Sequence, residues 1–182
     1  GIWACGAVTR RPRRIASLPA GKDDRPDGAW DGIWAIGGVL PGGARDAPAV
    51  VVYNRTGFDW SSRCVLALDA ATGHERWRFA CGPNPERLAI ADLDGDGTPE
   101  VVFTGNAQDN LEGLALNGTS DNAAMLFALD ARGALRWSRV LGGVFFNTHL
   151  QVADLDGDGT VEIVTATDNH GTDQDDRLCV WA

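Results

Sequence analysis

The stretch ADLDGDGTPE at residues 91–100 returns almost unchanged as ADLDGDGTVE at residues 153–162. Each copy places three aspartates at alternate positions and a glutamate shortly after them. Carboxylates this close repel one another unless a cation neutralises them. Alternating aspartates turn side-chain oxygens toward the inside of a tight loop, and the intervening glycines let the backbone turn. The two stretches therefore predict two Ca²⁺ sites, with candidate ligands Asp92, Asp94, Asp96, Thr98 and Glu100 in the first and Asp154, Asp156, Asp158, Thr160 and Glu162 in the second.

The sequence around each acidic stretch predicts strands rather than the helices of an EF-hand. An EF-hand loop needs a bidentate glutamate at its twelfth position, where this chain has Phe103 and Thr165. The residues after each stretch are rich in β-branched side chains, and the residues before it alternate, as in RLAIADL and HLQVADL. The predicted unit is a strand, an acidic loop and a second strand. A competing interpretation is an Asp-Gly turn that binds no metal, although such a turn needs fewer acids.

A second motif recurs with nearly the same period. The acidic loops lie 62 residues apart, from Asp92 to Asp154, and ALDAATGHERW at 67–77 is echoed 61 residues later by ALDARGALRW at 128–137. Each echo predicts a hairpin, because an alternating strand runs through a glycine-containing turn into a strand that carries Trp77 or Trp137. Two motifs with one period indicate a structural repeat. Joined to the unit around the acidic loop, the hairpin gives the four antiparallel strands of one β-propeller blade.

The predicted fold class is all-β, a β-propeller of four-stranded antiparallel blades with about three blades in this chain. Blade one spans 29–84 and has lost the acids of its first hairpin, so it should bind no calcium, and blade two spans 85–143. Blade three spans 144–182 and lacks its fourth strand, so it is either completed by strand exchange or truncated. Residues 1–8 are predicted as an N-terminal strand that completes a blade. Residues 9–28, rich in Pro, Gly and Arg, are predicted as a linker.

The acidic loops resemble FG-GAP or VCBS-type propeller repeats, the class that includes the integrin α-subunit head. Their pattern D-x-D-x-D-G-x-x-D/E matches residues 92–100 and 154–162, with Glu in place of the commoner Asp at the ninth position. The hairpins are similar to the tryptophan-docking motif of quinoprotein-type propellers. The first copy matches at Ala67, Asp69, Thr72, Gly73, Glu75 and Trp77, and the shorter second copy at Ala128, Asp130, Gly133 and Trp137. This resemblance covers most of residues 29–182 and implies a calcium-binding propeller, but it implies almost nothing about biological role.

The four cysteines suggest how the incomplete blade is closed. Cys64 and Cys81 lie roughly opposite across a predicted hairpin and are candidates for a cross-strand disulfide if the geometry allows. CVWA at 179–182 repeats CVLA at 64–67, and WACG at 3–6 resembles FACG at 79–82. Residues 1–8 are therefore predicted to supply the fourth strand of blade three and to pair Cys5 with Cys179. The strand could act within one chain or between chains, and our hypothesis is that it acts between chains. It would then give a dimeric six-bladed ring or an open filament. The competing interpretation is a truncated piece of a longer propeller.

Charge and cysteine usage narrow the partners and the compartment. The net charge is −9, and eight of the 25 acids lie in the two loops, so two bound Ca²⁺ ions would reduce it to −5. That leaves no basic field for nucleic acid, and no apolar run reaches the roughly 18–20 residues of a membrane span. An even cysteine count without metal-binding spacing favours an oxidising compartment, so an extracellular or cell-surface location is expected. The sequence begins GIWACG without an initiator Met, which predicts a mature, trimmed or excised piece from which any export signal would already be gone.

No common catalytic motif occurs in the sequence, so a non-catalytic module is expected more than an enzyme. The expected role is structural assembly, adhesion or binding of a protein or glycan, with self-association or pairing with another propeller segment. An acidic loop with Asp168, His170, Asp173 and Asp175 holds a metal or a sugar, or is simply solvated. The alternative function is a fragment or relative of a rhamnogalacturonan-type polysaccharide lyase, because those lyases resemble this chain in combining DLDGDG loops with LDxxGxxxW hairpins. No catalytic residue of that family can be assigned here.

Overall fold

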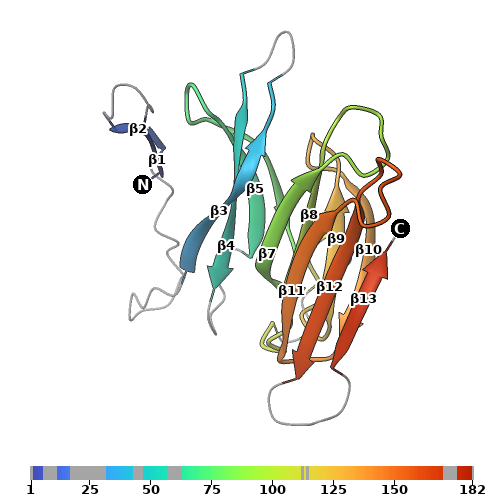
Figure 1. Ribbon diagram of the computed structural model, residues 1–182. Coiled ribbons are helices and arrows are strands. Elements are labelled where there is room, and N and C mark those ends of the chain that lie inside the picture. The colour runs from blue at the N-terminus through green and yellow to red at the C-terminus, as the bar shows by residue number, and fades with distance from the viewer. Residues whose placement is uncertain are drawn as a thin grey trace, which may run out of the picture.

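A computed structural model of the chain describes residues 2–5, 12–16, 32–42, 47–56, 63–111, 113, 115–169 and 176–181. In this part of the chain all regular structure is β, in three antiparallel sheets of four, four and three strands and a separate N-terminal pair (Figure 1). The predicted all-β class and the antiparallel sheets are therefore confirmed. None of the described residues forms a helix that is long and apolar enough to span a membrane.

Each sheet is built from strands that follow one another along the chain. The first sheet contains β3 (Gly32–Leu40), β4 (Ala49–Thr56), β5 (Cys64–Asp69) and β6 (Glu75–Ala80). The second contains β7 (Asn84–Ala91), β8 (Glu100–Asn106), β9 (Ala124–Leu129) and β10 (Leu135–Gly142), and the third contains β11 (Phe146–Ala153), β12 (Glu162–Asn169) and β13 (Arg177–Trp181). The N-terminal pair is β1 (Ile2–Cys5) and β2 (Pro12–Ala16).

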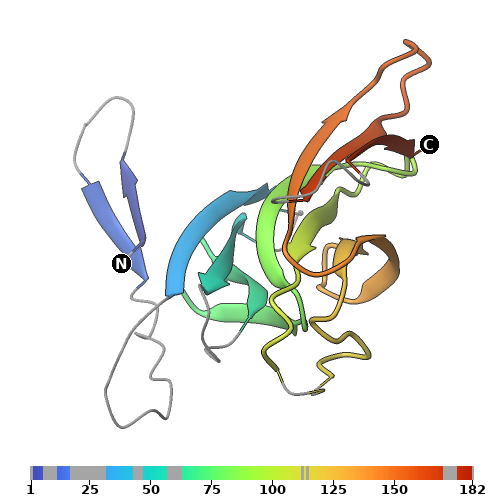
Figure 2. The same ribbon diagram turned by 90° about the horizontal axis from the view of Figure 1, so that it is seen from below.

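The three sheets pack face to face, and their first strands β3, β7 and β11 lie side by side (Figures 1 and 2). An apolar core that includes Val51, Val65, Phe103 and Phe127 fills the space between the first and second sheets. A second core between the second and third sheets includes Leu126 and Ile163. The middle sheet is covered on both faces, so β8 and β9 have nearly continuous apolar sequences instead of an alternating pattern.

Trp77 in the first sheet contacts the second sheet. Its indole N–H donates a hydrogen bond to the carbonyl oxygen of Ala131 (3.0 Å), in the turn between β9 and β10. The ring packs on Gly133 of the same turn, where a Cβ atom would lie 2.5 Å from the indole. The hairpin motif of the sequence thus carries its tryptophan to the turn of the following sheet.

The predicted disulfide between Cys64 and Cys81 is not formed, because the register places Ala80 rather than Cys81 opposite Cys64. The thiol of Cys81 instead donates to the carbonyl oxygen of Pro83 (3.2 Å), and burial raises its pKa. Cys179 is also a free thiol, and the side chain of Cys5 lies outside the described residues.

The N-terminal strand has a different partner from the one expected within the chain. β1 pairs with β2, which lies inside the predicted linker, and not with β13. Cys5 is therefore opposite Pro12, while Cys179 is opposite Thr165 in β12. Pairing of residues 1–8 with β13 of another copy stays a prediction.

Candidate metal centre

The two acidic loops join the first strand of a sheet to its second strand, β7 to β8 and β11 to β12. Both loops have the same backbone shape, because the glycines at matching positions adopt a left-handed conformation. Their φ angles are +72° and +84° at Gly95 and Gly97, and +80° and +94° at Gly157 and Gly159. Residues other than glycine rarely adopt such φ angles, so the G-D-G sequence sets the curvature of each loop.

The first and last acids of each loop are held by backbone amides. The carboxylate of Asp92 accepts hydrogen bonds from the N–H groups of Gly95 (2.9 Å) and Gly97 (2.8 Å). Glu100 reaches back to accept from the N–H of Leu93 (2.9 Å) and is only 2 % exposed. These bonds fix the two carboxylates in place.

The second loop repeats these bonds residue by residue. Asp154 accepts from the N–H groups of Gly157 (2.7 Å) and Gly159 (3.0 Å), and Glu162 accepts from the N–H of Leu155 (2.8 Å). The middle acids also match, because the amides of Thr98 and Thr160 each donate to the aspartate two residues earlier at 2.7 Å. The sequence repeat is therefore also a repeat of loop conformation.

The structure brings most of the predicted ligands together in two groups. Carboxylate oxygens of Asp92, Asp94 and Asp96 lie within 4.8 Å of one another, as do those of Asp154, Asp156 and Glu162. Calcium binds oxygens at about 2.4 Å, so oxygens separated by up to roughly twice that distance can share one ion. The geometry fits a hard divalent cation. Glu100 and Asp158 lie in these loops but outside the two groups of three.

Arg136 is a member of the first site that sequence reasoning missed. From the start of β10 its guanidinium donates to Oδ2 of Asp94 and to Oε1 of Glu100, each at 2.7 Å. This guanidinium holds the pKa of Asp94 below its usual range, and Asp94 in turn raises the pKa of Arg136. The first loop therefore already holds one cation, which is independent evidence that its carboxylates are arranged to accept positive charge.

The sequence contains one signal for this contact. An arginine precedes the tryptophan in both hairpin motifs, as Arg76 before Trp77 and Arg136 before Trp137. Arg76 donates to Asp69 (2.6 Å) and to the carbonyl oxygen of Ala47, just before β4 in its own sheet. Both arginines therefore reach across to the first hairpin of their sheet.

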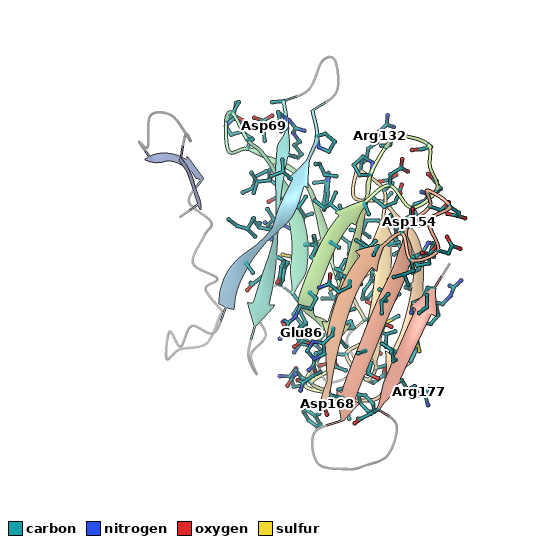
Figure 3. All side chains as sticks on the ribbon, viewed as in Figure 1. Asp69, Glu86, Arg132, Asp154, Asp168 and Arg177 are labelled. Carbon is teal, nitrogen blue, oxygen red and sulfur yellow. The ribbon has the colours of Figure 1, made fainter. Side chains whose placement is uncertain are left out.

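The other predicted cluster lies at the opposite end of the sheets. Figure 3 shows Asp154 and Arg132 at one end, and Asp168 and Arg177 at the other. Asp168 is an exposed residue of β12, and its predicted companions His170, Asp173 and Asp175 lie outside the described residues.

Comparisons with known proteins do not assign the chain to a family. No protein-family model matches it, and a search of curated proteins found no match. The likeness of residues 92–100 and 154–162 to FG-GAP repeats therefore stays a prediction that depends on the loop sequences.

Proposed function

We propose that this chain is a calcium-stabilised β-propeller module of the FG-GAP type that acts outside the cell in assembly, adhesion or ligand binding. One observation carries the proposal, namely the two loops that share sequence, backbone shape and hydrogen bonds and that each group three carboxylates. Asp92, Asp94 and Asp96 would hold one Ca²⁺, and Asp154, Asp156 and Glu162 the other. The ion would supply positive charge that joins the two ends of each loop.

The role of the ion would be structural. The carboxylates belong to loops that connect packed strands, and they converge only when those strands pair. An ion that binds only the folded chain stabilises it by mass action, by about 2.7 kcal/mol per site at 100 times the Kd. For a chain of this length, that stabilisation corresponds to a rise in Tm of about 5–10 °C per site.

Thermal unfolding with calcium and with EDTA tests this function. The matched control is the double variant Asp92→Asn, Asp154→Asn, which removes one charge from each loop and leaves both sheets intact. The unchanged protein should melt several degrees higher in millimolar Ca²⁺ than in EDTA, and the double variant should respond much less. Equal melting temperatures of the unchanged protein in both solutions would count against occupied loops.

The propeller interpretation is supported by how the sheets pack. Successive sheets stack on their faces with their first strands adjacent, and a tryptophan at the end of one hairpin docks on the turn of the next sheet. Propeller blades are four-stranded sheets arranged radially in this way. The three sheets would be three blades of such a ring.

Assembly with a second copy or another propeller segment is supported by the outer face of the third sheet. Leu178 in β13 is 75 % exposed, whereas the residues at the equivalent register position, Val65 in β5 and Leu126 in β9, are fully buried under the following sheet. Val180 lies on the same outer face and is 58 % exposed. A further sheet would cover these side chains, and a strand added along β13, which ends the described part of the sheet, would complete the blade.

A cavity beside β13 agrees with this incomplete blade. Trp137 occupies the position in the second sheet that Trp77 occupies in the first, but it lines a cavity of about 290 Å³ together with Trp181 and Arg139. The guanidinium of Arg139 lies 5.7 Å from the ring centroid of Trp137. In a complete blade, the turn that follows β13 would fill this cavity.

A further inference from the structure

Although the two acidic loops have the same backbone, they differ in their charged partners. In the first loop, Oδ2 of Asp94 and Oε1 of Glu100 both accept hydrogen bonds from the guanidinium of Arg136. In the second loop, no basic side chain among the described residues forms an ion pair with the matching Asp156 or Glu162. The first loop therefore contains its own cation, and the second has none among the described residues.

This difference alters which carboxylates converge. Glu162 lies within 4.8 Å of Asp154 and Asp156 in the second loop, whereas Glu100 is absent from the corresponding group in the first loop. One oxygen of Glu100 is bound to the amide of Leu93 and the other to Arg136. The arginine thus occupies an oxygen that the second loop leaves available for a metal.

Arg136 reaches the first loop from the fourth strand of its sheet. Arg136 stands at the start of a fourth strand, β10, and extends over the acidic loop of its own sheet. The third sheet has three described strands, so the corresponding position beyond β13 is not among them. In the first sheet the equivalent Arg76 is present, but there its partners are Asp69 and Ala47.

We propose that Arg136 is a built-in counter-cation that lowers the affinity of the first loop for Ca²⁺, so that the second loop fills first. This inference rests on the proposed calcium function. A metal entering the first loop must displace two charge-assisted hydrogen bonds or lie close to a guanidinium. Repulsion between a unit and a divalent charge a few ångströms apart lowers affinity by about tenfold or more, even with the screening of water. When the first loop holds no metal, Arg136 neutralises its carboxylates and holds its two ends together.

Calcium titration calorimetry on single-loop variants measures each loop separately. Asp154→Asn leaves the first loop as the site under test, and Asp92→Asn leaves the second. In the Asp154→Asn background, Arg136→Gln should tighten calcium binding by about tenfold or more. In the Asp92→Asn background, the same substitution should leave the Kd unchanged. Arg132→Gln is the matched control, because it removes a nearby exposed arginine that lines the same cavity as Asp96 and Glu100.

A second measurement tests the counter-cation without any metal. In EDTA, Arg136→Gln should lower the Tm by about 2–4 °C, whereas Arg132→Gln should not, and Arg136→Lys should restore part of the loss. Unchanged or weaker calcium binding at the first loop of Arg136→Gln would overturn the inference while leaving the calcium function intact, provided that the second loop binds. If neither loop binds calcium, the proposed function fails, and the affinity role of Arg136 fails with it. An unchanged Tm of Arg136→Gln in EDTA would separately refute the neutralising role.

Discussion

The indole of Trp77 lies directly on the backbone of Gly133, which has a φ of +81°. Two separate constraints therefore require glycine at this position. The backbone angle disfavours any side chain, and the closest indole atom, Cδ2, lies 2.5 Å from where a Cβ would stand. The contact joins two sheets, so a change at Gly133 should affect the whole stack as well as its own turn.

Gly133→Ala should destabilise the chain by about 2–4 kcal/mol, because left-handed strain and a clash with a packed indole both add to the cost. Gly118→Ala is the matched control, since Gly118 has a φ of +76° and a methyl group added there would meet nothing within 4 Å. That control should lose only the strain, about 1 kcal/mol. Urea unfolding followed by tryptophan fluorescence measures both variants. Equal losses would show that Trp77 moves aside at no cost.

Among elements, the long connection between β8 and β9 is held by a buried ion pair. Arg63, which directly precedes β5, donates to Asp121 (2.9 Å) and to the carbonyl oxygen of Gly82 (2.7 Å). Asp121 also accepts from the amides of Asn110 (2.7 Å) and Leu111 (3.2 Å). The side chains of the pair are 1 % and 3 % exposed, so each charge depends on the other.

Asp121→Asn should destabilise the chain by about 3–5 kcal/mol, because it leaves the Arg63 guanidinium buried without a counter-charge. The double variant Arg63→Met, Asp121→Asn should lose less than the sum of the two single variants, since it removes both charges. Urea unfolding gives the free energies, and hydrogen exchange of the amides at Asn110 and Leu111 reports the connection itself. A loss below about 1 kcal/mol in Asp121→Asn would mean that the pair contributes little.

The strands were predictable from local sequence, and their long-range partners were not. Alternation before the acidic loops and β-branched residues after them predict β7, β8, β11 and β12, and the structure contains all four. The pairing of Arg63 with Asp121 joins positions 58 residues apart, and no periodicity connects them. Register also escaped prediction, because the pairing shifts once between Ala67 and Leu68 and places Ala80, one residue short of Cys81, opposite Cys64.

Of the candidate site, only the acidic residues were predictable from sequence. The spacing of aspartates and glycines is a property of one short loop, so the candidate ligands can be found from sequence. Arg136 reaches that loop from two strands away across the sheet, and only the repeated Arg-Trp pair hints at its position. A charged partner that lies on another strand of the sheet can be identified only from the three-dimensional fold.

Across the whole molecule, the sheets meet around Glu86 at the start of β7. The hydroxyl of Tyr53 in the first sheet donates to the carbonyl oxygen of Glu86 (3.2 Å), and the Glu86 carboxylate accepts from the amide and hydroxyl of Thr148 in the third sheet (both 2.8 Å). The hydroxyls of Thr148 and Thr104 lie 2.8 Å apart. This buried polar contact fixes the spacing of three sheets whose remaining contacts are mostly apolar.

From the same stacking, we predict that the outer face of the third sheet is an interface. Val65 and Leu126 are each covered by the following sheet, while no described strand covers Leu178 at the equivalent position or Val180 on the same face. We expect the chain to associate through this face in the presence of calcium, so that sedimentation velocity gives a mass above that of the 19.3 kDa monomer. Val180→Lys should shift the population toward monomer, because a lysine cannot be desolvated cheaply under another sheet.

Val140→Lys is the matched control, since Val140 is 64 % exposed on the edge strand β10, and it is the same residue type away from the proposed interface. This variant should associate as the unchanged protein does.

Adding a reductant distinguishes non-covalent packing from covalent linkage. Loss of the oligomer would indicate an intermolecular bond between Cys5 and Cys179, and retention would indicate non-covalent packing of sheets. A monomer at all concentrations with calcium present, or equal effects of the two lysines, would contradict an interface at Val180.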